Sequence, residues 1–119
     1  MAKLLVVDDE LGIVEEVKSF FEEEGYTVLT ADTAKDGIEQ VIKEQPDVLI
    51  LDIKLPDASG IEVLKASKLH SPRTKVIVNT GYVDQNIIDE AEKLGRDCFL
   101  PKPFNLVKLK EEVDALLNR

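Results

Sequence analysis

Five short runs of apolar residues recur along the chain, separated by longer stretches with helical periodicity. The runs are rich in Val, Ile and Leu, which is typical of strands that are buried on both faces of a sheet. A strand of that kind requires helices above and below it. The runs cover residues 3–7, 26–30, 47–51, 75–79 and 97–100.

The stretches between these runs carry apolar residues three or four positions apart, together with helix start and stop signals. Thr33, followed by Asp36, resembles a capping box, and Asn105 is suited to cap a last helix. Gly25 and Gly95 stand where helices end, and Pro72 closes a third helix. The predicted buried faces comprise Val14, Val17 and Phe21; Ile38, Val41 and Ile42; Ile61, Leu64 and Leu69; Ile87, Ile88, Ala91 and Leu94; and Leu106, Leu109, Val113, Leu116 and Leu117.

Strict alternation of about five strands and five helices predicts a parallel α/β sheet with helices on both faces. Right-handed crossovers then leave few topologies, and the flavodoxin-like (βα)5 doubly wound order 2-1-3-4-5 is the one we expect. Residues 1–119 are expected to form a single domain. In such a sheet a ligand binds at the carboxyl ends of strands 1 and 3.

Composition excludes several classes of function. The net charge of −9 argues against direct binding of nucleic acid or of an anionic membrane surface. Cys98 and His70 are the only residues of their types, which excludes a Cys/His zinc site, a Cys–His catalytic pair and an internal disulfide. The sequence has no signal-peptide pattern and no apolar stretch near the ~20 residues of a membrane span, so we expect a cytoplasmic protein.

Polar side chains follow four of the five predicted strands. Asp8 and Asp9 follow the first, Asp52 the third, Thr80 the fourth and Lys102 the fifth. Three carboxylates brought together repel one another unless a cation relieves them, and hard oxygen ligands suit Mg²⁺, or Mn²⁺ in its place. An aspartate can attack phosphorus to give an acyl phosphate, while a hydroxyl and an ammonium group bind phosphoryl oxygens. The pattern therefore predicts metal-assisted phosphoryl transfer.

Each of these residues also has a structural interpretation when it is taken alone. An Asp after a strand is usually a turn or cap residue, and Glu10 suits a helix N-terminus. A Thr at a strand end reflects β-propensity, and Lys102 before Pro103 is typical of a solvated loop. The functional interpretation depends on their coincidence at one edge of the predicted sheet.

The chain resembles the receiver domains of two-component response regulators over essentially its whole length. The resemblance is carried by "LLVVDDE", "DVLILDIKLPDASGIEVL", "VIVNTGY" and "CFLPKPF". It implies that Asp52 is the phosphoacceptor and that Asp8 and Asp9 hold Mg²⁺ with it. It also implies that the backbone carbonyl of Lys54 completes the protein's metal ligands. The chain would then not be a conventional enzyme, although it would catalyse its own phosphorylation and dephosphorylation at Asp52.

The same resemblance implies a switch. Thr80 and Lys102 would contact the phosphoryl group, and Phe99 holds the position of the switch aromatic. A sensor histidine kinase or a histidine phosphotransfer protein would supply the phosphoryl group. Phosphorylation would remodel the face of helix 4, strand 5 and helix 5, which would act on an output domain or a downstream protein or serve homodimerisation. The resemblance further implies a cis Lys102–Pro103 bond, and a position with positive φ for Gly60.

Two side chains near the expected site are less typical of the family. Lys54 and Tyr82 would flank the approach of a hydrolytic water, and we expect them to slow loss of the phosphoryl group. This pair is similar to that of the single-domain receiver of the sporulation phosphorelay, and stand-alone chemotaxis receivers are also similar. "TGY" followed by an acid also resembles receivers of enhancer-dependent transcription activators. A kinase-docking face on helix 1 would include Leu11, Gly12, Val14 and Glu15, although Val14 fits a core position equally well.

Three other functions remain to be weighed. A phosphatase of the haloacid-dehalogenase type needs a second acid two residues after its nucleophile, where this chain has Lys54, and a cap domain that these residues do not supply. A flavodoxin needs a phosphate cradle after strand 1, where "DDE" would repel a phosphate. A non-catalytic docking module is expected to lack part of the acid set, which this chain retains.

Overall fold

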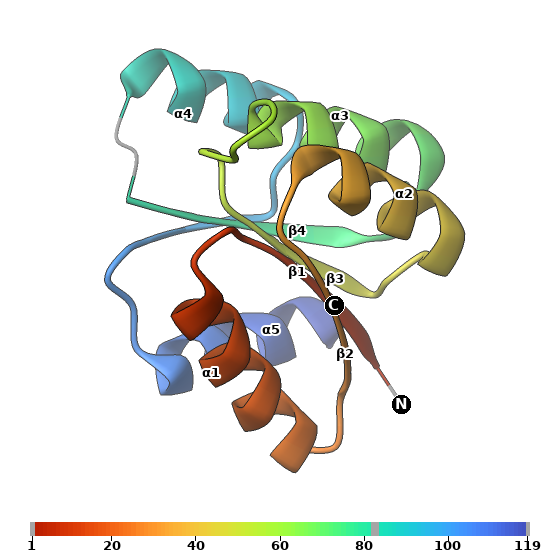
Figure 1. Ribbon diagram of the computed structural model, residues 1–119, viewed down its shortest axis with the longest axis vertical. Helices are drawn as coiled ribbons and strands as arrows, with labels where there is room; N and C mark the ends of the chain where they lie inside the picture. The colour runs from red at the N-terminus through yellow and green to blue at the C-terminus, as the bar shows by residue number, and fades with distance from the viewer. Residues whose placement is uncertain (1, 82–83, 119) are drawn as a thin grey trace.

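The computed structural model describes residues 2–81 and 84–118, and its centre is a five-stranded parallel sheet (Figure 1). The strand order is β2-β1-β3-β4-β5, as the sequence predicts. The chain thus has the doubly wound arrangement in which the order of the strands reverses beside β1. The strands are β1 (Lys3–Val7), β2 (Thr27–Ala31), β3 (Val48–Leu51), β4 (Lys75–Thr80) and β5 (Cys98–Pro101).

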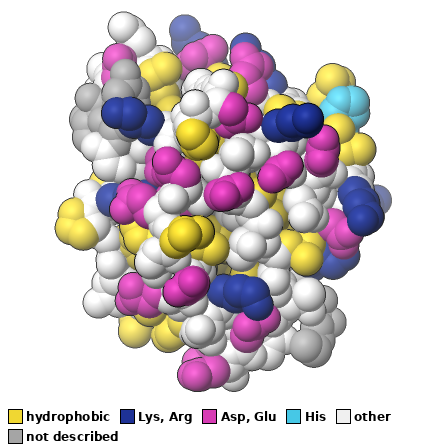
Figure 2. Space-filling view, in the orientation of Figure 1, with side chains coloured by type: hydrophobic (Ala, Val, Ile, Leu, Met, Phe, Trp, Pro, Cys, Tyr) yellow, Lys and Arg dark blue, Asp and Glu magenta, His cyan; other side chains and the backbone are white. Residues whose placement is uncertain are grey.

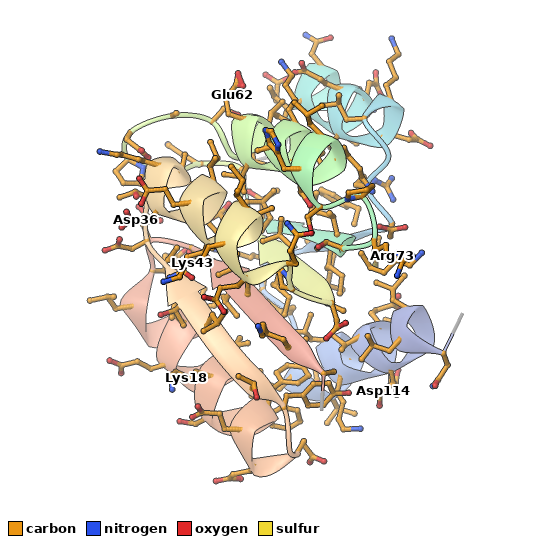
Figure 3. All side chains as sticks on the ribbon, turned by 90° about the vertical axis from the view of Figure 1, so that its right-hand side faces the viewer. Lys18, Asp36, Lys43, Glu62, Arg73 and Asp114 are labelled. Atoms are coloured by element: carbon orange, nitrogen blue, oxygen red, sulfur yellow. The ribbon has the colours of Figure 1, made fainter. Side chains whose placement is uncertain are left out.

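Five helices cover the two faces of the sheet, as Figure 1 shows. On one face α2, α3 and α4 pack against the sheet, and on the other α1 and α5 do so. The labelled side chains in Figure 3 follow this division, with Lys18 and Asp114 on one side and Asp36, Lys43 and Glu62 on the other. The helices are α1 (Leu11–Glu23), α2 (Ala34–Glu44), α3 (Gly60–His70), α4 (Gln85–Lys93) and α5 (Leu106–Leu117).

The apolar strands supply two cores, one under each helical layer. In β1, Leu5 and Val7 point toward the layer of α2 and α3, while Leu4 and Val6 point toward α1 and α5. All four side chains are almost fully buried. This alternation explains why the strands read as continuous apolar runs, because each face of the sheet has a helical layer to pack against.

The predicted helix signals are confirmed. The Thr33 hydroxyl accepts a hydrogen bond from the Asp36 N–H, and the Asn105 carboxamide oxygen accepts from the N–H groups of the first turn of α5. Gly25 and Gly95 each adopt a φ of 94°, the left-handed conformation that ends a helix and that glycine adopts without a steric penalty.

Some expected details differ. Three strands, β2, β3 and β5, begin one residue later than predicted, and β4 continues through Thr80. Leu69 is 75% exposed, because a residue five positions after Leu64 lies about 140° around the helix from it, and Val63 and Ser67 occupy the buried face instead. Ile42 lies beside the buried stripe of α2 and is 45% exposed.

The surface bears interspersed acidic and basic side chains over the face shown in Figure 2. Within the part of the chain that the structure describes, none of the helices is long and apolar enough to cross a membrane.

Candidate functional site

The carboxyl ends of the central strands bring the predicted polar residues to one edge of the sheet. The ladder between β1 and β3 continues one residue past the strands, where the Asp52 N–H donates to the Val7 carbonyl at 2.9 Å. Asp8 and Asp52 therefore leave adjacent strands side by side. On the other side of the site, the Lys102 N–H donates to the Thr80 carbonyl at 3.0 Å. The backbone thus fixes where these side chains start.

The ammonium group of Lys102 lies among three carboxylates. Its Nζ is 2.8 Å from Asp8 Oδ2, 3.0 Å from Asp52 Oδ2 and 2.8 Å from Glu10 Oε1. The side chains of Lys102, Asp8 and Asp52 are at most 10% exposed, whereas that of Glu10 is 58% exposed. The single positive charge of Lys102 therefore offsets only part of the negative charge of Asp8, Asp52 and Glu10, and Glu10 lies on the solvent side of the group.

Burial and ion pairing act on the pKa values of this group in opposite directions. Burial raises the pKa of Asp8 above its usual range, although the hydrogen bond from Lys102 and that from the Glu10 N–H partly offset the effect. Burial alone would lower the pKa of Lys102, but its three carboxylate partners raise it above its usual value. Lys102 is therefore a permanent cation in this site at physiological pH.

The acid cluster has a different membership from the one that the sequence suggested. Asp8, Glu10 and Asp52 place one carboxylate oxygen each within 4.8 Å of one another, a donor set of hard oxygens that fits a cation such as Mg²⁺. Asp9 is exposed and lines the adjoining cleft. The sequence predicts Glu10 to be a solvated residue at the start of α1, and no local signal marks its contact with Lys102.

The loop from β3 to α3 forms the opposite side of the site. The Lys54 N–H donates to Asp52 Oδ1 at 3.3 Å, and Lys54 pairs with Ser59 in an isolated antiparallel bridge. The prediction that Gly60 needs a positive φ is wrong. Glycine is required there by close approach instead, because a Cβ at Gly60 would lie 2.1 Å from the carbonyl oxygen of Asp52.

An open cleft of about 480 Å³ lies over these residues. Thr80, at the end of β4, is only 1% exposed, yet it forms part of the cleft wall. Tyr82, to which we assigned a part in phosphoryl lifetime, lies outside the described residues. The cleft is lined by Asp9, Glu10, Asp52, Lys54, Leu55, Pro56, Thr80 and Gly81.

A sequence model of the response regulator receiver domain family matches residues 4–114. The chain belongs to this family. Receiver domains are signalling domains of two-component and phosphorelay systems.

Three proteins show how far the similarity of this chain to known receivers extends. Sporulation initiation phosphotransferase F of Bacillus subtilis is 35% identical over 115 residues, which is 97% of this chain and 93% of the relative. Response regulator SaeR of Staphylococcus aureus is 33% identical over 119 residues, so the whole receiver spans 52% of SaeR. A CheY-like receiver domain from Methanospirillum hungatei is 35% identical and superimposes with a TM-score of 0.89, covering 99% of this chain and 98% of that one.

The receiver's β5 side holds the expected switch residue. Phe99 is half-buried against the core beneath α2, α3 and α4, and the guanidinium of Arg96 lies 5.9 Å from the centre of its ring. The Lys102–Pro103 peptide bond is cis, as the resemblance implied. On α1, Leu11 is 64% exposed, whereas Val14 belongs to the core and is not part of an exposed docking face.

Proposed function

We propose that this receiver accepts a phosphoryl group from a phosphohistidine onto Asp52. The observation that carries the proposal is the convergence of Asp8, Asp52 and Lys102 from three separate strands, with Thr80 in the wall of the same cleft. The donor would be a sensor histidine kinase or a histidine phosphotransfer protein. The relation to a sporulation phosphotransferase supports a place in a phosphorelay.

Asp52 has the surroundings of an oriented nucleophile. One carboxylate oxygen is paired with Lys102 and the other accepts from the Lys54 N–H, so the carboxylate plane is fixed before the donor arrives. A new bond forms between an Asp52 oxygen and phosphorus, the phosphorus–nitrogen bond of the phosphohistidine breaks, and the imidazole leaves with that electron pair. Lys102 then pairs with the phosphoryl oxygens, as does the hydroxyl of Thr80.

The proposal includes a divalent metal. Asp8, Asp9 and Asp52 would hold Mg²⁺ or Mn²⁺ together with the backbone carbonyl of Lys54. Asp9 and Asp52 line the cleft, and Asp8 lies beside Asp52. When bound, the ion supplies charge neutralisation for the transferring phosphoryl group. Asp8 and Asp52 lie beside each other, and Lys102 offsets only one of their two negative charges, which supports the assignment of a cation there.

The switch would pass from Thr80 through β5 to its neighbours. Thr80 pairs in register with Pro101, and Phe99 lies two residues earlier on the same strand. Movement of Thr80 toward the phosphoryl group would allow the Phe99 ring to turn inward, away from Arg96. The changed face of α4, β5 and α5 would then act on an output domain, a downstream protein or a second copy of the chain.

We further infer that residues 1–119 act as a single cytoplasmic domain that binds neither nucleic acid nor a membrane directly. The net charge of −9 supports this inference. Lys54 and Tyr82 would lengthen the life of the phosphorylated state. The decay of phosphorylated Asp52 in Lys54→Asn and Tyr82→Ala measures this effect, and decay at the wild-type rate in both variants would contradict it.

Acetyl phosphate with Mg²⁺, followed by intact-protein mass spectrometry, tests the main proposal. We expect one added phosphoryl group on the wild type and on Asp36→Asn, an exposed α2 variant that serves as the control, and none on Asp52→Asn. Absence of modification on the wild type, together with no response to beryllofluoride, would favour a docking module instead. Turnover of a generic phosphoester would revive the phosphatase alternative, and a yellow protein would revive the flavodoxin.

A further inference from the structure

Asp57 links two elements that lie on either side of the candidate site. It belongs to the loop between β3 and α3, yet its carboxylate accepts hydrogen bonds from the first turn of α2. Oδ1 accepts from the Ala34 N–H at 2.8 Å, and Oδ2 accepts from the Lys35 N–H at 3.0 Å. These backbone hydrogen bonds lower the pKa of Asp57, so the carboxylate is ionised near neutral pH. Figure 3 shows α2 and α3 side by side in this region.

The α2 end of this link is firmly held. Ala34 is 1% exposed. One turn later, Gly37 faces β1 so closely that an added Cβ would lie 3.0 Å from a methyl group of Val7. Val7 directly precedes Asp8, so the start of α2 is packed against the end of β1, the strand that Asp8 and Asp9 follow. The first turn of α2 is therefore a fixed point relative to Asp8 and Asp9.

The loop end of the link is held by Leu55, which is buried in the core, and by backbone contacts at its base. There the Gly60 N–H donates to the Ile53 carbonyl at 2.6 Å, and Lys54 pairs with Ser59. Residues 56–59 beyond it are exposed. The bonds from Asp57 to α2 fasten this exposed part of the loop to a neighbouring helix. They act at a distance of only three residues from Lys54, whose carbonyl belongs to the proposed metal site.

We propose that Asp57 is a positioning residue, which holds the β3–α3 loop at a fixed distance from the Asp8–Asp9 turn by fastening the loop to α2. This inference rests on the proposed function, because the two sides it keeps in place are the two sides of the proposed metal site. Mg²⁺ tolerates little deviation from octahedral geometry. Partners that orient metal ligands without touching the metal are therefore important for affinity.

Loss of the link should act on metal binding rather than on chemistry. In Asp57→Ala the loop samples more conformations, so we expect Mg²⁺ to bind about 10-fold more weakly, the lower end of the range for residues that support metal ligands. The phosphorylation rate from acetyl phosphate at saturating Mg²⁺ should stay near that of the wild type. Asp57→Asn retains one acceptor oxygen and should give an intermediate Mg²⁺ affinity.

Thr33→Ala provides a matched control. The Thr33 hydroxyl also caps α2, accepting from the Asp36 N–H at 3.1 Å, but it lies within the helix's own segment and makes no link to the loop. Both variants remove a cap from the same helix end. Only Asp57→Ala should weaken Mg²⁺ binding, if the loop position is what matters.

The measurements are Mg²⁺ titration by calorimetry and amide hydrogen exchange at Ala34, Lys35 and Gly60, with urea unfolding to compare overall stability. Support consists of weakened Mg²⁺ binding and faster exchange in Asp57→Ala, with near-normal binding in Thr33→Ala. Equal Mg²⁺ affinity in the wild type and Asp57→Ala would overturn the inference, as would equal losses in the two variants. A wild type that binds no Mg²⁺ would instead overturn the proposed function on which the inference rests.

Discussion

Replacement of Lys102 by methionine tests whether this one cation holds the acid cluster together. Methionine preserves most of the length and apolar volume of the lysine stem but removes the charge. In the variant, Asp8 and Asp52 would remain buried beside each other without their counterion. We expect a large loss of stability in the metal-free protein, because uncompensated buried charge is costly.

The magnitude follows from the burial of the partners. Removing one member of a buried ion pair typically costs about 3–5 kcal/mol of folding stability. This range applies here because the side chains of Lys102, Asp8 and Asp52 are all buried. The contact with Glu10 adds little, because that carboxylate is 58% exposed and screened by water. For a chain of 119 residues, a loss of 3–5 kcal/mol lowers Tm by about 12–20 °C.

Urea unfolding followed by far-ultraviolet circular dichroism is a suitable assay, since the chain contains no tryptophan. It should be run with a chelator and again with Mg²⁺. Mg²⁺ should stabilise Lys102→Met more than the wild type, because it supplies the missing positive charge. Lys18→Met removes an exposed pair with Glu22 and, as a control, should cost about 0.5 kcal/mol or less.

Acidification provides a second reading of the same variant. Without Lys102 the folded-state pKa of Asp8 rises further, so protonation of Asp8 at low pH relieves its repulsion with Asp52. The deficit of Lys102→Met should therefore shrink as the pH falls toward 4 and be largest at neutral pH. A metal-free Lys102→Met that unfolds within about 1 kcal/mol of the wild type at pH 7 would refute this account of the cluster.

Three further predictions concern single side chains. Asp9→Ala should weaken Mg²⁺ binding in calorimetry while raising metal-free stability by a few tenths of a kcal/mol, because Asp9 is exposed and adds only like charge; a fall in stability would show a structural function. Tyr26 donates to Asp114, and burial followed by this bond raises its pKa to about 12. The Tyr26–Asp114 hydrogen bond should contribute fully to stability below pH 10, and this contribution should be lost between pH 10 and 12. Ultraviolet titration of a variant whose other tyrosine is phenylalanine follows the ionisation of Tyr26. Burial and Glu112 raise the pKa of Cys98 to about 11, so its thiol should react with a disulfide reagent at pH 8 about 100-fold more slowly than in the urea-unfolded chain, and equal rates would contradict this.

The fold could be predicted because its signals are local and redundant. Strands buried on both faces have no polar alternation, and caps such as Thr33 and Asn105 mark where helices begin. Parallel topology then places the ends of the strands together, which is why the sequence alone predicts that Asp8, Asp52 and Lys102 share one site.

The details that escaped prediction depend on distances across the fold. The contact of Glu10 with Lys102 joins residues 92 positions apart, and nothing in the local sequence distinguishes Glu10 from a solvated acid at a helix start. The sequence predicts a left-handed backbone at Gly60, whereas its actual constraint is the carbonyl of Asp52, which lies at the other end of the β3–α3 loop. The hydrogen bond from the Ala34 N–H to Asp57 likewise depends on how the β3–α3 loop lies against α2, which the local sequence does not show.

The counterion of Asp52 comes from a part of the chain that is made much later. Lys102 and Asp52 are 50 residues apart, and Lys102 reaches Asp52 only after β5 has paired with β4. Closing such separated segments is entropically costly until the intervening strands are in place. A nascent chain on the ribosome therefore carries an incomplete acid cluster until residue 102 has emerged and β5 has docked. Under the proposed function, only molecules that have finished folding would be competent to accept a phosphoryl group.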